Sequence, residues 1–328
     1  MAREAGVSMA TASRAINGSP DRTVGEELQR RVLEVAARLE YSPDANAQAM
    51  ARGRTAIIGL VVHDIRDPYF SAIAAGVTAA ADAEHLAVTL ANTQHDPQRE
   101  LAFVQTLQQQ RARAIILAGG RQDDDRANAA LREALEAYRK RGGTAAVVGQ
   151  PVLGVSAVHA DNAGGASALA EALLDQGYRR FGILAGPERH LTARERTTGF
   201  VAALDAARIA PAAVVPSAFT RDGGYEGLAR LREQAPDVEL VWAVNDVMAL
   251  GAMTAARDLG LEVPRDLAFA GFDDITTLRD VSPALTTVHL PLEEMGRLAT
   301  PLALDVAGGV REVTVSGEVV LRESTPAR

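Results

Sequence analysis

The sequence contains no cysteine, and this absence excludes several kinds of chemistry at once. A chain without Cys cannot form disulfides, Cys-ligated zinc sites or iron–sulfur clusters, and it has no thiol nucleophile. Its six histidines are scattered along the chain, without an HExxH-type pair that could hold a metal. We therefore expect neither a metal nor another cofactor.

Long apolar runs are missing as well. No run approaches the roughly 18–20 apolar residues that a membrane-spanning helix requires, and residues 1–4 lack the apolar core of a signal peptide. These absences predict a cytoplasmic protein without membrane contact. Apolar residues still make up 47% of the 328 residues, an ordinary share for a folded protein, and this length predicts two or three domains.

Acidic residues outnumber basic ones, and the excess is unevenly distributed. Residues 1–56 contain eight Arg and seven acidic residues, whereas the rest of the chain contains 26 basic and 35 acidic residues. An acidic body repels polyanions, so any contact with nucleic acid is expected from the first segment. The excess of one positive charge in that segment is too small to establish such a contact by itself.

The first segment, residues 1–56, has helical patterns but no strand pattern. A short helical stub over 2–5 precedes a longer helix, which is predicted over 8–17. One face of the longer helix is apolar. The opposite face carries Met9, Ala10 and Arg14. Two helices, a tight turn and an outward Arg are typical of a helix-turn-helix.

A further helix and a short helical stretch follow in the same segment. A capping box from Thr23 to Glu26 predicts the start of the further helix. Its apolar residues recur at helical spacing: Leu28, Val32, Val35 and Leu39. Pro43 ends this pattern, and Asp44 offers an N-cap for a short stretch over 45–52.

From Thr55 onward, short apolar strands alternate with amphipathic helices. The predicted strands are 56–62, 86–90, 114–117, 145–148, 181–185, 213–215, 240–243 and 267–270. The predicted helices between them include 72–84, 100–110, 163–176, 195–207 and 246–259. This alternation predicts parallel sheets with helices on both faces, and ligands of such sheets bind at the carboxyl ends of the strands.

Short motifs stand out in a fixed order along the whole chain. In the first segment they are 3–18 (REAGVSMATASRAING), 41–44 (YSPD) and 54–59 (RTAIIG). In the body they are 67–70 (DPYF), 161–162 (DN), 245–251 (NDVMALG), 271–274 (GFDD), 282–288 (SPALTTV) and 322–325 (REST). Each motif alone is weak, but their joint order is specific. Together they resemble the LacI/GalR (lactose repressor) family of bacterial transcription regulators.

The resemblance assigns the DNA contacts to the helix over 8–17. In this family that helix enters the major groove, and Met9, Ala10 and Arg14 match its base-reading positions. Arg14 can pair with guanine, whereas Met9 and Ala10 offer only apolar contacts. The positions that bind the phosphate backbone are matched by Ser8, Thr11, Ser13 and Asn17. For the first two of these, helix capping is the alternative interpretation, and both roles are compatible.

The stretch over 45–52 resembles the family's hinge helix, which wedges an apolar side chain into the minor groove beside its dimer mate. Met50 stands at the wedge position, where Leu is usual. Asp44 stands where Asn is usual, and a plain N-cap is its favoured interpretation. Met1 falls inside the family's first helix, so we expect about half of that helix to be missing from this head.

The resemblance implies a head, a hinge and a two-lobed body. The expected regions are a helix-turn-helix head (1–44), a hinge helix and linker (45–55) and an effector-binding and dimerisation domain (56–328). The last is expected to resemble type I periplasmic binding proteins, with doubly wound subdomains at 57–157 plus 288–317 and at 160–286. The implied fold class is a small all-α head joined to an α/β body with two parallel sheets.

The family's effector-contact positions are matched by Tyr69, Phe70, Thr192, Arg196, Phe219, Asn245 and Asp273. Their chemistry suits a small polyhydroxylated ligand, sugar-like or nucleoside-like. Three of them have plainer interpretations: core packing for Phe70, a helix cap for Asp273 and a solvated helix face for Arg196. Leu290 and residues 149–150 depart from the most familiar sugar-binding pattern, which leaves the effector unidentified.

Three classes of function are compatible with such a body: a DNA-binding regulator, a solute-binding protein of a transport system, and an enzyme. The head and the lack of a signal peptide disfavour the transport protein. No phosphate-binding loop or GxSxG elbow supports an enzyme, and the acidic run 123–125 is more simply a helix start than a cation site. The resemblance therefore implies an effector-responsive repressor that binds a near-palindromic DNA operator as a homodimer, without a heptad tail for tetramers.

Overall fold

The computed structural model describes residues 1–17, 24–41 and 53–328, and the chain divides into two compact units, Met1–Thr55 and Ala56–Arg328. Several predictions fall outside the described residues: those on Thr23, Asp44, Met50 and the hinge stretch 45–52. Within the described ranges, no helix is long and apolar enough to cross a membrane.

The N-terminal unit contains helices α1 (Met9–Asn17) and α2 (Glu26–Arg38). Its small core consists of Ala5, Ala12, Ala15 and Val32. The stub predicted over 2–5 forms hydrogen-bonded turns instead of a helix, because too few residues are available to close a helical ladder.

The predicted start and apolar stripe of helix α2 need correction. The helix begins at Glu26 with Gly25 as its N-cap, so Glu26 is its first residue and not the third, as a capping box from Thr23 to Glu26 would require. Two acidic residues in the first turn stabilise this start through the helix dipole. Leu39 is the C-cap and is 41% exposed, so it does not belong to the apolar stripe.

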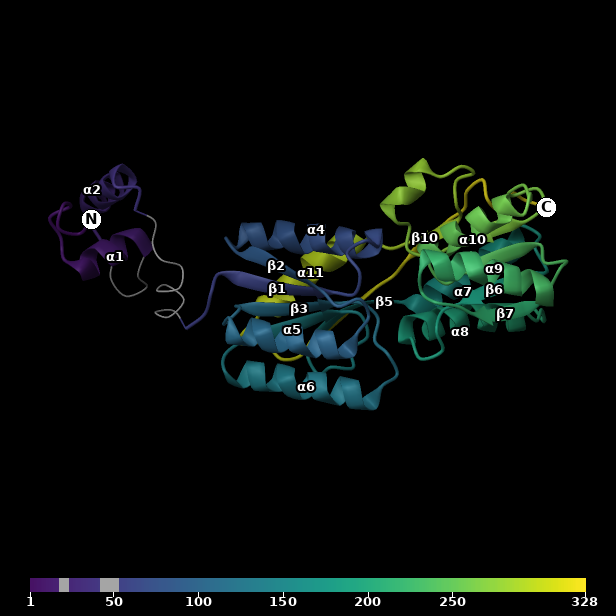
Figure 1. Cartoon of the computed structure of the whole chain (residues 1–328), viewed down its shortest axis with the longest axis horizontal. Coiled ribbons are helices and arrows are strands. Elements are labelled where there is room, and N and C mark those ends of the chain that lie inside the picture. The colour runs from purple at the N-terminus through teal and green to yellow at the C-terminus, as the bar shows by residue number, and fades with distance from the viewer. Residues whose placement is uncertain (18–23, 42–52) are drawn as a thin grey trace. The chain divides into compact units, whose positions relative to one another are not determined.

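The first lobe of the second unit is built on a parallel six-stranded sheet in the order β11-β5-β4-β3-β1-β2. Its strands are β1 (Ile57–Val62), β2 (Ala87–Asn92), β3 (Ala114–Ala118), β4 (Thr144–Val148), β5 (Ser156–Ala160) and β11 (Glu312–Val315). Its helices are α4 (Pro68–Ala83), α5 (Pro97–Gln109), α6 (Asp125–Lys140) and α11 (Leu292–Leu304). Helices α4 and α11 cover one face, and α5 and α6 cover the other (Figure 1).

The second lobe has a parallel four-stranded sheet in the order β7-β6-β8-β9. Its strands are β6 (Phe181–Ala185), β7 (Ala213–Pro216), β8 (Leu240–Ala243) and β9 (Ala268–Ala270). Its helices are α7 (Asn162–Asp175), α8 (Leu191–Ala206), α9 (Arg221–Gln234), α10 (Asp246–Asp258) and the short 3-10 helix η1 (Thr276–Asp280). The packing of α7 on α8 and of α9 on α10 completes a helix–sheet–helix sandwich.

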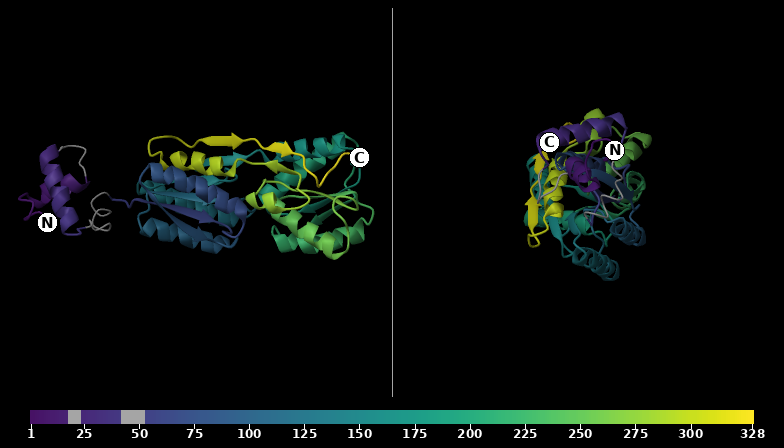
Figure 2. Two further views of the ribbon diagram at one scale, coloured as in Figure 1. Left: turned by 90° about the horizontal axis from the view of Figure 1, so that it is seen from above. Right: turned by 90° about the vertical axis from the view of Figure 1, so that its left-hand side faces the viewer.

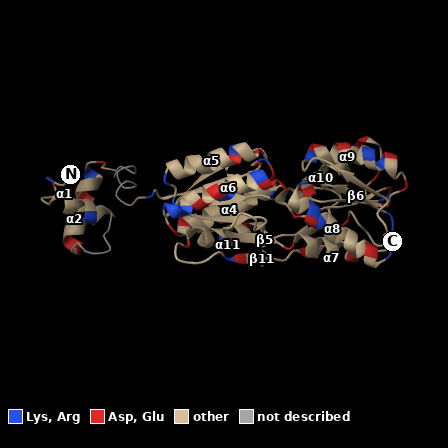
Figure 3. Cartoon of the chain, turned by 90° about the horizontal axis from the view of Figure 1, so that it is seen from below, with Lys and Arg blue, Asp and Glu red and all other residues tan. Residues whose placement is uncertain are grey.

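Three segments join the lobes: β5 to α7, β10 to α11, and β11 to β12. Strands β10 (Thr287–His289) and β12 (Glu318–Val320) pair antiparallel. The chain from β11 into β12 can be followed from the first lobe to the second (Figure 2, left). Acidic and basic residues are interspersed along the helices of both lobes (Figure 3), so neither lobe presents a helix surface of one charge only.

Candidate functional site

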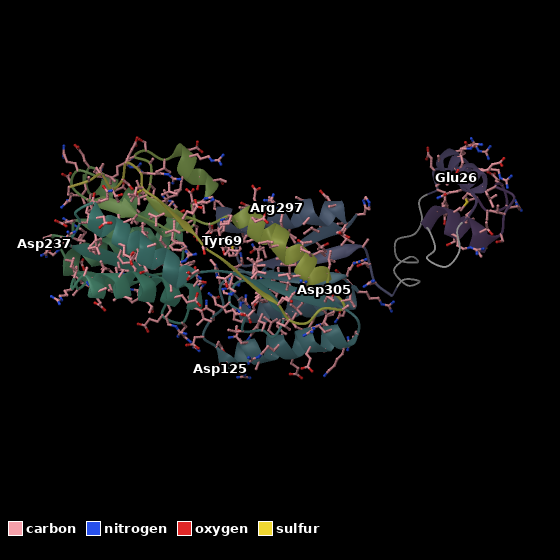
Figure 4. The ribbon with its side chains drawn as sticks, turned by 180° about the vertical axis from the view of Figure 1, so that it is seen from behind. Glu26, Tyr69, Asp125, Asp237, Arg297 and Asp305 are labelled. Carbon is pink, nitrogen blue, oxygen red and sulfur yellow. The ribbon has the colours of Figure 1, made fainter. Side chains whose placement is uncertain are left out.

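One cavity between the lobes brings together all seven predicted effector contacts. Its lining residues are His63, Asp67, Tyr69, Phe70, His95, Gly120, His190, Thr192, Arg196, Phe219, Asn245 and Asp273. The cavity encloses about 390 Å³ of empty space, its open mouth included. Both lobes contribute side chains, and Tyr69 can be located at their junction (Figure 4).

The fold explains this convergence, because the lining residues follow the carboxyl ends of parallel strands. Three of them are helix N-caps. The side chain of Asp67 accepts the N–H of Tyr69 (2.9 Å), that of His190 accepts the N–H of Ala193 (3.4 Å), and that of Asn245 accepts the N–H of Met248 (3.0 Å). The starts of α4, α8 and α10 are therefore fixed around the cavity.

Arg196 is the most heavily engaged side chain of the cavity. It is 2% exposed, so its interpretation as part of a solvated helix face was wrong. Its Nε donates to Asn162 Oδ1 (2.9 Å), its Nη1 to the Val244 carbonyl (2.7 Å) and its Nη2 to Asp273 Oδ1 (2.7 Å). The guanidinium carbon lies 3.9 Å from the centroid of the Phe272 ring. Three of the five N–H donors of the guanidinium are thus committed to the protein, which leaves two for a ligand.

Asp273 is held in an unusual environment. Burial raises the pKa of its carboxyl to about 7, although the neighbouring Arg196 opposes this shift. Its φ of +118° is rare for a residue with a side chain, and such backbone strain is found mostly at functional sites. The interpretation of Asp273 as a cap of the next helix was wrong, because η1 has Ile275 at its N-cap and no side-chain cap.

The aromatic residues of the cavity have two kinds of partner. Phe219 stacks on His190, with ring centroids 4.5 Å apart and planes at 19°. Phe70 is 5% exposed and contacts Tyr69 edge-on at 5.1 Å, so it packs in the core and also lines the cavity. The Oδ1 of Asn245 already accepts one hydrogen bond as a cap, so this side chain can offer a ligand its amide N–H groups and the remaining lone pair of that oxygen.

Five lining residues were not predicted from the sequence: Gly120 and four with polar side chains, Asp67, His63, His95 and His190. Three of the six histidines, scattered in sequence, gather here because each follows a strand end. Burial lowers the pKa of all three rings, that of His190 to about 3, so they are neutral near pH 7. Their position after predicted strands was the signal that could have indicated them.

A polar network connects the two lobes beside the cavity. Gln150 follows β4 in the first lobe, and its Nε2 donates to Thr192 Oγ1 (2.9 Å) and Glu195 Oε2 (3.0 Å) of α8 in the second. On the same edge, Asp123 forms an ion pair with Arg194 at 2.7 Å. Leu290, in contrast, is 2% exposed and does not line this cavity.

Helix α1 presents the predicted DNA-facing side chains of the N-terminal unit. Met9 is 83% exposed and Ala10 is also exposed. Arg14 is half-buried and lies along the helix, where its Nε donates to the Ala10 carbonyl at 3.1 Å and its Nη2 to Thr11 Oγ1 at 3.4 Å. Reaching a base edge therefore requires Arg14 to exchange these local bonds for bonds to DNA.

The backbone-contact residues of α1 are only partly described. Ser8 Oγ accepts the N–H of Thr11 at 3.1 Å, which confirms the helix-capping interpretation of Ser8. Ser13 is exposed, and the side chain of Asn17, like Met50, lies outside what the structure describes. DNA contact by these residues stays a prediction.

Residues 1–17, 24–41 and 53–328 contain no group of three His, Asp or Glu side chains that could hold a metal ion. Within the acidic run 123–125, Asp124 Oδ1 accepts the N–H of Ala127 at 3.0 Å as the N-cap of α6. The helix-start interpretation of this run is confirmed.

Comparison with known proteins adds independent information. Residues 1–44 match the family described as bacterial regulatory proteins, lacI family, and residues 170–325 match the periplasmic binding protein-like domain. The chain is 33% identical to the HTH-type transcriptional regulator GalS of Salmonella typhimurium (strain LT2), over 96% of this chain and 91% of the relative.

Two solved structures match over nearly the full length. One is a transcriptional regulator CelR–cellobiose complex, with a TM-score of 0.73, 29% identity and 98% of each chain covered. The other is a lac repressor dimer bound to operator and an anti-inducer, with a TM-score of 0.84, 24% identity and 99% and 98% of the two chains covered; it supports the fold alone. The chain therefore belongs to the LacI family of helix-turn-helix transcription regulators with a periplasmic-binding-protein-like effector domain, and it is not an enzyme.

Proposed function

We propose that the protein is a repressor that binds a near-palindromic DNA operator as a homodimer and senses a small sugar-like or nucleoside-like effector. The observation that carries the proposal is the interlobe cavity, in which seven side chains expected from the resemblance converge. Residues 1–44 form the DNA-binding head, 45–55 the hinge and 56–328 the sensing and dimerisation domain. Met50 is the minor-groove wedge in this proposal.

On the DNA side, α1 lies in the major groove. Arg14 reads a guanine, while Met9 and Ala10 contact apolar groups such as a thymine methyl. Ser8, Thr11, Ser13 and Asn17 bond phosphate oxygens and fix the register of the helix without reading bases. This division of roles agrees with the exposure of Met9 and Ala10, and it requires Arg14 to exchange its bonds to Ala10 and Thr11 for bonds to a base.

On the effector side, the ligand joins the lobes. Tyr69 and Phe70 belong to the first lobe, whereas Arg196 and Asp273 belong to the second. A ligand that contacts both stabilises one relative arrangement of the lobes, in proportion to its differential affinity for the arrangements. We infer that this arrangement decides how the hinges of a dimer pair, and hence how tightly the heads bind DNA.

The division of roles on α1 is tested with two single substitutions. Arg14→Ala should lower affinity for the operator by about 5- to 150-fold, the equivalent of 1–3 kcal/mol, and relax the preference at one base position. Ser13→Ala should weaken binding to all sequences about equally. Binding is measured by mobility shift on the DNA beside the protein's own gene and on a panel of single-base variants. Equal losses on every site for both variants would refute the assignment.

A second experiment separates a regulator from a solute-binding protein without DNA contact. The regulator should bind DNA at low salt and lose affinity steeply as salt is raised, because each phosphate contact releases counterions. A protein that senses a solute alone should show neither behaviour.

A further inference from the structure

We propose that Asp67 selects the charge of the effector, so that the cavity favours ligands carrying a protonated amino group over neutral ones and disfavours phosphorylated ones. This inference rests on the proposed function of the cavity as the effector site. It names a contact that the sequence did not indicate, and a narrower chemical class of ligand.

The geometry gives Asp67 one free oxygen toward a ligand. Its Oδ1 is fixed as the N-cap of α4 by the N–H of Tyr69, at 2.9 Å. Its second oxygen has no hydrogen-bond or ion-pair partner among the residues that the structure describes, and the side chain lines the cavity. The cap fixes the side chain at the cavity wall, so its second oxygen is available to a ligand there.

Among the residues that the structure describes, none forms an ion pair with Asp67, and the charge of Arg196 lowers its pKa only in part. The nearby guanidinium groups are already paired: Arg196 with Asp273, Arg121 with Glu100, and Arg66 with Asp64. The groups that face Asp67 from the surrounding elements are His63, Asp64, Tyr69, His95, His190, Arg196 and Asp273. Since the histidines are neutral near pH 7, the cavity contains two carboxyl groups and a single guanidinium.

This imbalance has a physical consequence for the empty cavity. Burial raises the pKa of Asp67 to about 7, and the carboxyl groups of Asp273 and Asp64 add to this shift. The hydrogen bond from Tyr69 and the charge of Arg196 oppose it without cancelling it. A ligand ammonium would supply the missing positive charge and hold the carboxylate ionised. A phosphate would instead bring a further negative group beside the carboxyl groups of Asp67 and Asp273, and like charges at short range repel.

The inference is tested by calorimetric titration of the full-length protein with aldohexoses and with their 2-, 3- and 6-amino and 6-phosphate derivatives. For the hexose that binds, we expect one amino derivative to bind about tenfold tighter, as for one added charge-assisted contact, and the phosphate to bind more weakly. Asp67→Asn should abolish both differences, because Asn keeps the cap but not the charge. Tightest binding by the phosphate, or an unchanged order in Asp67→Asn, would overturn the inference.

A measurement without ligand separates this inference from the proposed function. A carboxyl whose pKa is raised by folding stabilises the folded state at low pH, and this contribution is lost as the pH rises through about 7. The parent protein should therefore lose this contribution as the pH is raised from 5 to 8, and Asp67→Asn should not. The melting temperature of the variant minus that of the parent should rise over this range. Asp96→Asn, at the exposed N-cap of α5, is the matched control for exchanging a cap.

If Asp67→Asn shows no greater gain in stability than this control, Asp67 is not an uncompensated carboxyl and the inference fails, whatever ligand binds. If Asp67→Asn gains stability but no hexose derivative binds, Asp67 is an uncompensated carboxyl as inferred, and the proposal of a sugar effector is refuted.

Discussion

Arg196→Ala is expected to lower the free energy of unfolding of the effector domain by about 3–5 kcal/mol, because it leaves the buried carboxyl of Asp273 without its partner. The substitution also removes donors to Asn162 and Val244 and the contact with the Phe272 ring. These groups come from separate segments of the second lobe. Arg196 therefore holds the ligand-facing wall together in addition to any contact with a ligand.

Denaturant unfolding of the parent and variant measures this loss, and thermal shift with a bound effector measures the loss of response. The matched control is Arg194→Ala on the same helix. Arg194 is exposed and pairs with Asp123 across the lobes, so its removal should cost only about 0–1 kcal/mol. Equal stability losses for the two variants, or full effector response in Arg196→Ala, would contradict this role of Arg196.

Arg121→Met is expected to have a similarly large effect, about 3–5 kcal/mol, for a different part of the molecule. Arg121 and Glu100 form a bidentate pair with contacts of 2.7 and 2.9 Å, and their side chains are 3% and 9% exposed. The same guanidinium lies 3.0 Å from Nε2 of His63, at the edge of the effector cavity. Removal of Arg121 leaves the carboxylate of Glu100 inside the first lobe without a cation.

The double variant Glu100→Met with Arg121→Met separates the two causes of such a loss. Replacing both members of a buried pair by apolar residues is often close to neutral, whereas removing one member is not. We therefore expect the double variant to unfold at a higher denaturant concentration than Arg121→Met alone. If the two variants unfold at the same concentration, the loss comes from packing and not from the unpaired carboxylate.

The sequence predicted the alternation of strands and helices in the body because each buried element has its own local apolar pattern. It failed for β5 and β11, which join the first sheet. Strand β11 alternates exposed and half-buried residues at the edge of that sheet, so no buried run indicates it. Strands β10 and β12 were missed for a related reason: each has three residues of which at least one is exposed, whereas the three residues of the predicted strand β9 are all buried.

The candidate site was predictable to the extent that it follows strand ends or family motifs. The convergence of Tyr69, Arg196 and Asp273 is of this kind. The partners of these residues were not predictable. Arg121 pairs with Glu100 and Arg196 with Asp273 across long stretches of chain, and no periodic pattern encodes such pairs. The partners of the Asp67 carboxyl were also not predictable, since the sequence does not indicate that one of its oxygens caps a helix while the other stays available.

A ligand in the interlobe cavity is expected above all to control the affinity of the head for DNA. The most direct measurement is the affinity of the full-length protein for the DNA beside its own gene, titrated with and without a ligand that raises its thermal stability. The account predicts sequence-dependent, salt-sensitive binding whose dissociation constant changes with the ligand, and the same factor must appear in the ligand's affinity when DNA is present. A dissociation constant for DNA that stays the same at saturating ligand would contradict it.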